Sequence, residues 1–178
     1  MIILGIDPGT LKTGYGIVKH SSGKTILVAS GVIENKRIKS LPFRLKFIYD
    51  EVTKLIEKFS PDELCIESAF YGKNAQSALK IGHARGVTIL AAINCEIPTY
   101  EYSPKEIKKS IVGNGSATKQ QVMYMVNQLL GIKKKKTKFD ETDAIAVALC
   151  HLNKLFKLHT KHRDWKNFVK ENPHLVID

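Results

Sequence analysis

Residues 6 to 16 read IDPGTLKTGYG, and they place one aspartate between an apolar run and a glycine-rich turn. The chain begins with the apolar run MIILGID, which ends at Asp7 and is followed at once by Pro8 and Gly9. A short apolar run closed by Pro-Gly is typical of a buried strand. Asp7 can start the turn after such a strand, or it can present a carboxylate at the strand's end. This stretch alone leaves both explanations open.

Periodicity along the rest of the chain predicts further strands and helices. GYGIVKH and TILVASGVIE read as two strands joined by a Ser-Gly turn, and ELCIE (63–67) and PTYEY (98–102) as two more. Helical spacing predicts helices over 41–59, 74–94, 103–112, from a Ser116 cap to Gly131, and over 140–156. This order predicts an α/β domain of residues 1–156, with one five-stranded mixed sheet and helices on both faces. Residues 157–178 form a basic tail whose structure the pattern does not define.

The chain is strongly basic. Its 178 residues include 28 Lys and Arg against 17 Asp and Glu, a formal net charge of +11. Such a charge favours a polyanionic partner, with nucleic acid as the leading candidate, because binding releases counterions. Simple solubility explains the charge equally well, so composition alone does not choose between them.

Cysteine spacing and hydropathy indicate a reduced, soluble protein. Cys65, Cys95 and Cys150 form neither a C-x-x-C pair nor a zinc-binding pattern. The longest apolar run, VTILAAI, is far shorter than the roughly 18 residues that a membrane helix needs. We therefore expect a cytoplasmic protein with no membrane association.

Glu67 repeats the arrangement seen at Asp7, because it also ends a predicted buried strand. If the two strands are neighbours, both carboxylates lie side by side at one edge of the sheet. Burial and mutual repulsion would then keep one of them protonated unless a cation is bound. Glu67 can instead cap the helix that follows it.

Asp140 and Asp143 open the last predicted helix three residues apart, so they lie on one face of it. An acid at the N-cap and another in the first turn are also favourable to the helix dipole. For this pair alone, the structural explanation is the more common one.

The four acids together point to a metal site. They supply hard oxygen ligands without a His or Cys cluster, which suits Mg²⁺ or Mn²⁺ rather than zinc. Two such ions about 4 Å apart can activate water and stabilise the leaving oxygen of a phosphodiester. In this interpretation Gly9, Gly14 and Gly16 clear space near Asp7 for a phosphate backbone or a metal and permit a tight turn.

The predicted helix 74–94 carries Ala78, Gly82 and Gly86 four residues apart, which makes a smooth stripe. Small residues allow another backbone to approach closely. The stripe predicts either contact with the sheet or a dimer interface. The residues alone favour neither explanation over the other.

Four segments resemble those of the RuvC crossover junction endodeoxyribonucleases, in the same order and with nearly constant spacing. They are GIDPGTLKTGYG, CIESAFYGKNAQSALKIGHARG, IVGNGSATKQQV and DETDAIAVALCH, and the resemblance covers about residues 1 to 155. It implies a ribonuclease-H-like fold, a homodimer packed through helix 74–94, and RuvA and RuvB as bacterial partners. It also implies symmetric, metal-dependent nicking of Holliday junctions in DNA recombination and repair, leaving 5′-phosphate and 3′-hydroxyl ends.

The resemblance also implies roles for individual residues. The catalytic, metal-binding carboxylates fall on Asp7, Glu67, Asp140 and Asp143, with two Mg²⁺ per subunit, for which Mn²⁺ can substitute.

Three further residues match DNA-contacting positions of the family. Phe70 matches an aromatic that stacks into the open junction centre, with a core aromatic as the alternative. Lys108 and Lys119 match basic residues near the scissile phosphate, where Lys119 takes part in catalysis; ordinary solvated lysines are the alternative.

The lysines at 133–136 and the tail beyond about residue 156 lie outside the part of the pattern that carries the resemblance. The lysines at 133–136 can grip a DNA arm, although such a run is more often a solvated loop. His151 is expected in the core or on the surface, with a supporting role beside the catalytic helix as the alternative.

Other functions are compatible with parts of the pattern. An ATP-dependent phosphotransferase of the actin and sugar-kinase type also carries an early Asp before Gly and Thr, but it needs two such domains. A non-catalytic junction-binding or RNA-binding module is disfavoured because all four carboxylates are present. A nuclease of the same fold that acts on another nucleic-acid structure is compatible with these carboxylates.

Overall fold

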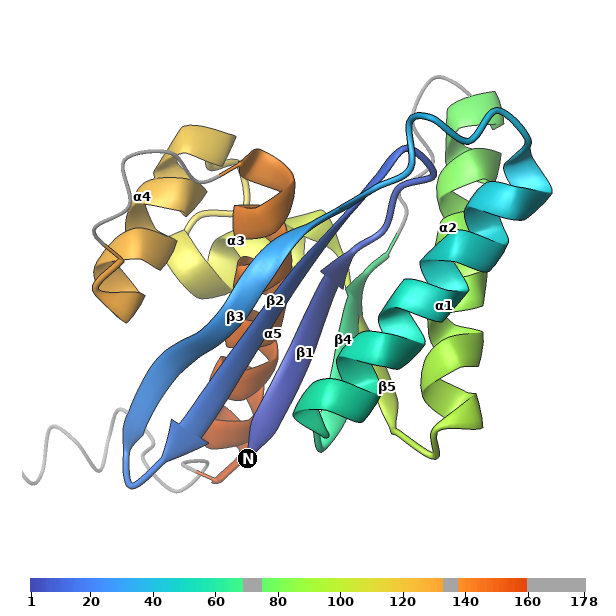
Figure 1. Ribbon diagram of the computed structural model, residues 1–178. Helices are drawn as coiled ribbons and strands as arrows, with labels where there is room; N and C mark the ends of the chain where they lie inside the picture. Colours follow the sequence, from blue (N-terminus) through green and yellow to red (C-terminus); the bar gives the residue numbers. More distant parts are fainter. Residues whose placement is uncertain (69–74, 133–137, 160–178) are drawn as a thin grey trace, which may run out of the picture.

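The structure is a computed structural model of the chain, and it describes residues 1–68, 75–132 and 138–159 (Figure 1). Within these ranges no helix combines the length and the apolar character that crossing a membrane requires. The last described helix continues to His159, three residues past the boundary expected at residue 156.

One five-stranded mixed sheet forms the centre of the fold, in the order β3-β2-β1-β4-β5. The strands are β1 (Ile2–Asp7), β2 (Lys12–Ser21), β3 (Lys24–Glu34), β4 (Glu63–Glu67) and β5 (Thr99–Tyr102). The first three form an antiparallel meander, whereas β4 and β5 run parallel to β1. The predicted mixed sheet is therefore confirmed.

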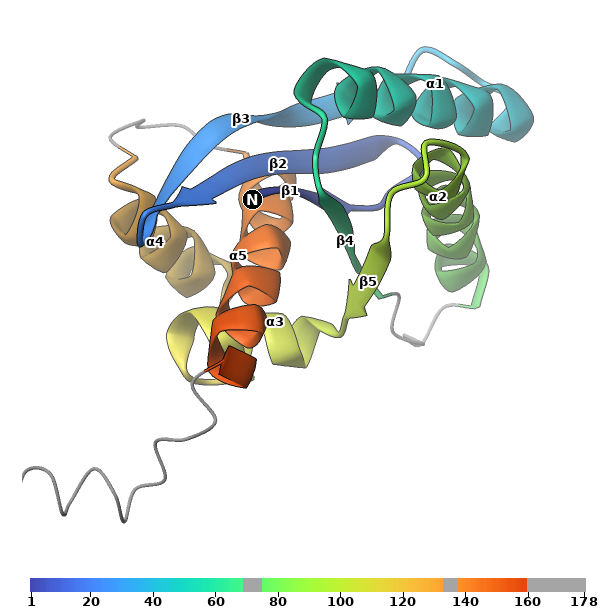
Figure 2. The same cartoon turned by 90° about the horizontal axis from the view of Figure 1, so that it is seen from below.

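Helices cover both faces of this sheet, as predicted (Figure 2). One face carries α1 (Leu41–Phe59) and α2 (Ala75–Asn94); the other carries α3 (Pro104–Val112), α4 (Lys119–Leu130) and α5 (Phe139–His159). Alternation along β1 separates two cores, because Leu4 and Ile6 pack with the first pair of helices and Ile3 packs toward α5.

Glycines let the backbone of α5 lie directly on β1 and β2. A methyl group at Gly14 would overlap the carbonyl oxygen of Asp140, and one at Gly16 would lie 2.6 Å from a side-chain carbon of Ile145. The expectation that Gly14 and Gly16 clear space for a phosphate or a metal is therefore wrong, because a helix fills that space. Gly9 instead belongs to a tight turn, where an added methyl group would overlap the carbonyl of Lys12.

The sequence prediction for the start of α4 was wrong. Thr118, rather than Ser116, caps α4: its hydroxyl accepts from the backbone N–H of Gln121, whose side chain accepts from the backbone N–H of Thr118. This reciprocal pair satisfies two otherwise unpaired donors and therefore sets the first residue of α4 at Lys119.

The apolar spacing of these helices also includes two exposed residues, Leu129 of α4 at 53% and Phe156 of α5 at 41%.

Candidate functional site

Asp7 and Glu67 lie side by side at one edge of the sheet. Parallel strands β1 and β4 pair Ile6 with Ile66, so the next residue of each strand is the acid. Side chains alternate along a strand, and Ile3 and Cys65 both pack toward α5. Asp7 and Glu67 share that parity with them, so both point to the face that carries α5.

Asp140 and Asp143 reach the same edge of the sheet from α5, the helix that packs on that face. Both lie at the N-terminal end of α5, and Gly14, which pairs with Asp7 in the sheet, lies directly beneath the backbone of Asp140. The close approach permitted by Gly14 therefore sets the distance of this helix end from Asp7.

Electrostatics link the four carboxylates. Burial raises the pKa of Asp7 to about 8, and repulsion from Glu67, Asp143 and Asp140 adds to it, against the attraction of Lys119. Burial likewise raises the pKa of Glu67 to about 7, with repulsion from Asp143 as the next cause. The edge is thus an acidic pocket with too little positive charge to compensate it.

Lys119 and Lys108 stand beside these acids. Lys119 begins α4, and its Nζ donates to Oδ2 of Asp143 at 2.5 Å. Burial works to lower the pKa of Lys119, but the hydrogen bond to Asp143 and the attraction of Asp143, Asp7 and Glu67 together outweigh it, so the pKa lies above its ordinary value. Both lysines line a pocket of about 150 Å³ together with Glu67 and Asp143. The structure thus brings both predicted lysines to the predicted acids.

The donor set fits a hard divalent cation in chemistry and charge. Carboxylate oxygens are the ligands that Mg²⁺ prefers, and a cation here would replace repulsion among the buried acids with attraction. Within residues 1–68, 75–132 and 138–159, however, no three His, Cys, Asp or Glu side chains converge as a complete metal cage. Asp143 in particular is engaged by Lys119.

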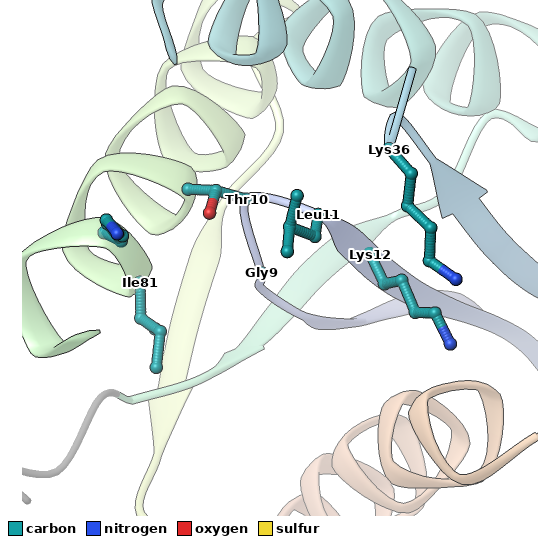
Figure 3. A pocket seen from close by; sticks show the side chains of 7 residues that line it. Gly9, Thr10, Leu11, Lys12, Lys36 and Ile81 are labelled. Carbon is teal, nitrogen blue, oxygen red and sulfur yellow. The ribbon is translucent and has the colours of Figure 1, made fainter. Parts of the chain in front are cut away.

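A second pocket of about 360 Å³ adjoins this edge and was missed by the sequence prediction (Figure 3). The turn from Gly9 to Lys12 forms one wall, with Ile81 on the other side, and the side chains of Lys12 and Lys36 extend in the same direction. Lys12 also lies 3.8 Å from Asp140. Lys80 completes the lining. The one sequence feature that could have indicated this pocket was the position of Lys12 close after Asp7.

The open stripe of α2 faces away from the sheet. An added methyl group at Gly82 or Gly86 would meet no atom within 4 Å, whereas the alanines at 84, 91 and 92 are fully buried in the core under α1 and β1. The alternative that Gly82 and Gly86 contact the sheet is therefore wrong.

Three predicted features lie outside the described residues. They are the aromatic Phe70, the lysines at 133–136, and the tail beyond residue 159. Their roles stay predictions.

Comparison with known proteins identifies the family. The model of the family described as "Crossover junction endodeoxyribonuclease RuvC" matches residues 3–151. The chain is 42% identical to that enzyme from Salinibacter ruber over 181 residues, spanning all of both chains. It is 47% identical to the one from Saccharophagus degradans over 152 residues, 85% of this chain and 87% of the relative.

Comparison of the fold with solved structures indicates the same family. A Thermus thermophilus RuvC, solved in complex with a Holliday junction substrate, superimposes with a TM-score of 0.81 at 30% identity, covering 87% of this chain and 94% of that one. The ribonuclease-H-like fold expected from the resemblance is thereby confirmed. Sequence and fold together place this chain in the family of RuvC crossover junction endodeoxyribonucleases.

Proposed function

We propose that this chain resolves Holliday junctions by nicking two strands of like polarity. One observation carries the proposal: Asp7 and Glu67 lie side by side and half-buried at a sheet edge, facing the acidic end of α5 and two lysines. Membership of the family supplies the substrate class, because its Thermus thermophilus relative was solved with a Holliday junction.

Nucleases of this family are metal-dependent. In this chain Asp7, Glu67, Asp140 and Asp143 would hold the metal, which we propose to be two Mg²⁺ per subunit, with Mn²⁺ as a substitute. Such ions provide a nucleophile from water at neutral pH and stabilise charge on the phosphate.

The lysines serve the scissile phosphate. Lys119 is held in place by Asp143, so its positive charge is fixed at the edge of the carboxylate pocket, where negative charge grows in the transition state. Lys108 lines the same pocket and binds the phosphate from the α3 side.

The second pocket offers a path for the DNA backbone away from the cut. Lys12, Lys36 and Lys80 surround it, and Leu11 and Ile81 form apolar walls that can contact a sugar or a base. Because it adjoins Asp7 through the turn at Gly9, we infer that it binds the nucleotides next to the scissile phosphate.

The double variant Lys36→Ala/Lys80→Ala should weaken junction binding at physiological salt about tenfold and reduce the slope of log affinity against log salt by roughly two. The reason is that two phosphate contacts, and the counterions they release, are lost. Titration of a labelled junction at several salt concentrations in EDTA measures both quantities. Lys24→Ala, at the far β2–β3 hairpin, serves as the control; an equal effect there would contradict the assignment.

We further propose that the chain is a homodimer formed through α2. Leu79, Leu90 and Ile93 are each more than half exposed and, with Gly82 and Gly86, follow one stripe at i, i+3, i+7, i+11 and i+14. A twofold dimer would match the symmetry of a four-way junction and deliver one nick per subunit.

Leu90→Glu should weaken the dimer by about tenfold or more, because the charge would be buried unpaired at the interface. Sedimentation over a concentration series measures this change, and paired nicks in a junction should become single nicks. Phe43→Glu, which alters a still more exposed apolar side chain on α1, should leave the dimer intact. A wild-type chain that sediments as a monomer at micromolar concentration would refute the interface.

The family resemblance also leads us to propose action beside RuvA and RuvB in the bacterial cytoplasm. Stimulation of nicking by RuvA and RuvB on a mobile junction tests this partnership.

The central experiment compares a labelled four-way junction with linear duplex and structured RNA, each with Mg²⁺ or EDTA. Symmetric nicks in the junction alone, absent in EDTA, are the expected result. Equal cutting of duplex or RNA would favour a nuclease of the same fold with another substrate.

A further inference from the structure

A buried polar cluster lies at the middle of α5, about two turns beyond the carboxylates. His151 is 1% exposed, its Nδ1 is 2.6 Å from the hydroxyl of Tyr102, and its Nε2 bonds to Glu63. Because a carboxylate only accepts, Nε2–H of His151 is the donor to Glu63. None of these three residues lines the pockets at the carboxylate edge.

The cluster connects the same elements that carry the catalytic acids. Glu63 is the first residue of β4 and Glu67 is the last, whereas His151 follows Asp143 along α5. Tyr102 ends β5, the neighbour of β4. Tyr102 pairs with Glu67 in the sheet, so Glu63 is the member of the cluster at the strand end remote from the chemistry. One set of hydrogen bonds therefore joins α5 to two neighbouring strands.

The distance from the cluster to the catalytic acids is nearly the same along β4 as along α5. From Glu63 to Glu67 is four residues of strand, a length of about 13 Å. From Asp143 to His151 is eight residues of helix, a rise of about 12 Å. When His151 meets Glu63 at one end, Asp143 is therefore level with Glu67 at the other.

Packing between α5 and the sheet supports the same level. Ala144 and Ala148 lie against Gly5, and Ile145 packs against Gly16 in the same interface. Directional hydrogen bonds in a buried site resist sliding, because a shift of one helical residue, about 1.5 Å, would break them.

We infer that His151 is a positioning residue: its bonds to Glu63 and Tyr102 set the height of α5 so that Asp143 and Asp140 face Asp7 and Glu67. The inference rests on the proposed role of those acids in metal binding. It assigns His151 no contact with the substrate or the metal.

The same cluster extends to α3. Lys154 lies 4.4 Å from the centroid of the Tyr102 ring and donates to Glu106 at 2.8 Å. Glu106 in turn forms the capping box of α3 with Ser103, and α3 carries Lys108. The cluster around His151 and Tyr102 therefore also helps to position Lys108, the lysine proposed to bind phosphate.

The test uses His151→Ala, His151→Gln and Tyr102→Phe in the full chain. Asn153→Ala is the matched control, because Asn153 also lies on α5 but bonds to Ser110 of α3 and not to the sheet. Two readouts are needed: the rise in melting temperature that Mg²⁺ induces without DNA, and the nicking rate at saturating Mg²⁺ on a four-way junction. Junction affinity in EDTA is measured alongside them.

We expect His151→Ala to lower the nicking rate about tenfold or more and to reduce the Mg²⁺-induced rise, because acids displaced by an ångström no longer converge. His151→Gln, whose amide N–H can still donate to Glu63, should restore most of both. Junction affinity in EDTA should stay at the wild-type value in all variants, and Asn153→Ala should keep the wild-type Mg²⁺ response.

Tyr102→Phe keeps the volume of the ring and decides the matter if His151→Ala does not fold. A wild-type Mg²⁺ response and nicking rate in Tyr102→Phe, or an equal loss in Asn153→Ala, would overturn the positioning role. Failure of the wild-type protein to nick a junction would instead refute the proposed function, so the two failures are distinguishable.

Discussion

Asp7→Asn should reduce nicking by at least about 10³-fold while junction binding in EDTA stays unchanged. The substitution keeps the shape of the side chain but removes the charge that would hold a metal at the end of β1. Single-turnover cleavage of a labelled junction measures the loss, and a binding titration in EDTA measures the affinity.

The same variant should be more stable than the wild type when no metal is present. The pKa of Asp7 is raised from 3.8 to about 8, so the folded protein binds more protons than the unfolded chain between those values. Stability of the metal-free wild type must then fall as pH rises from about 4 to 8. The loss amounts to no more than about 6 kcal/mol. An asparagine side chain at this position cannot ionise, so the variant avoids that part of the loss.

Urea unfolding in EDTA at pH 5, 6, 7 and 8 measures this slope. Mg²⁺ at pH 8 should raise the stability of the wild type and have little effect on Asp7→Asn. Asp50→Asn, on the exposed side of α1 where it pairs with Lys46, is the control and should keep the wild-type slope. Identical pH slopes in the wild type and Asp7→Asn would show that Asp7 is not a buried, repelled acid.

Gly14→Ala should destabilise the fold by about 3 kcal/mol and abolish most of the nicking. The added methyl group overlaps the carbonyl of Asp140, a backbone atom that can move only if the end of α5 moves. That movement carries Asp140 and Asp143 away from Asp7. Urea unfolding gives the stability, and the nicking rate is compared at a temperature where the variant is folded.

Gly86→Ala provides the contrast for the stability of the single subunit, because nothing in the subunit lies within 4 Å of its added methyl group and it is in a helix. It should raise stability by up to about 1 kcal/mol. Normal nicking and stability in Gly14→Ala would mean that α5 does not rest on β2 as closely as described.

Local patterns in the sequence were sufficient for the elements and for the identity of the acids. Apolar runs that end in Asp7 and Glu67 mark strand ends, and the helical spacing of residues 41–59 marks α1. Strand and helix periods depend on neighbours in the chain, so they can be read without knowledge of the fold. Four motifs in order then predicted the family.

Pairings between distant residues could not be read in this way. The role of Gly14 was misassigned, because the sequence does not say that α5, more than 120 residues later, rests on it. The lysines at 36 and 80 gave no signal, because exposed lysines are common and only the fold brings these two to one pocket.

Sequence thus set which segments are strands and helices and which carboxylates are available for chemistry. Tertiary structure set the parallel register that joins Asp7 to Glu67, the contact of α5 with the sheet, and the bonds of His151 to Glu63 and Tyr102. The difference has a physical cause. Periodicity follows from the local geometry of the backbone, whereas distances between remote side chains depend on how whole elements pack.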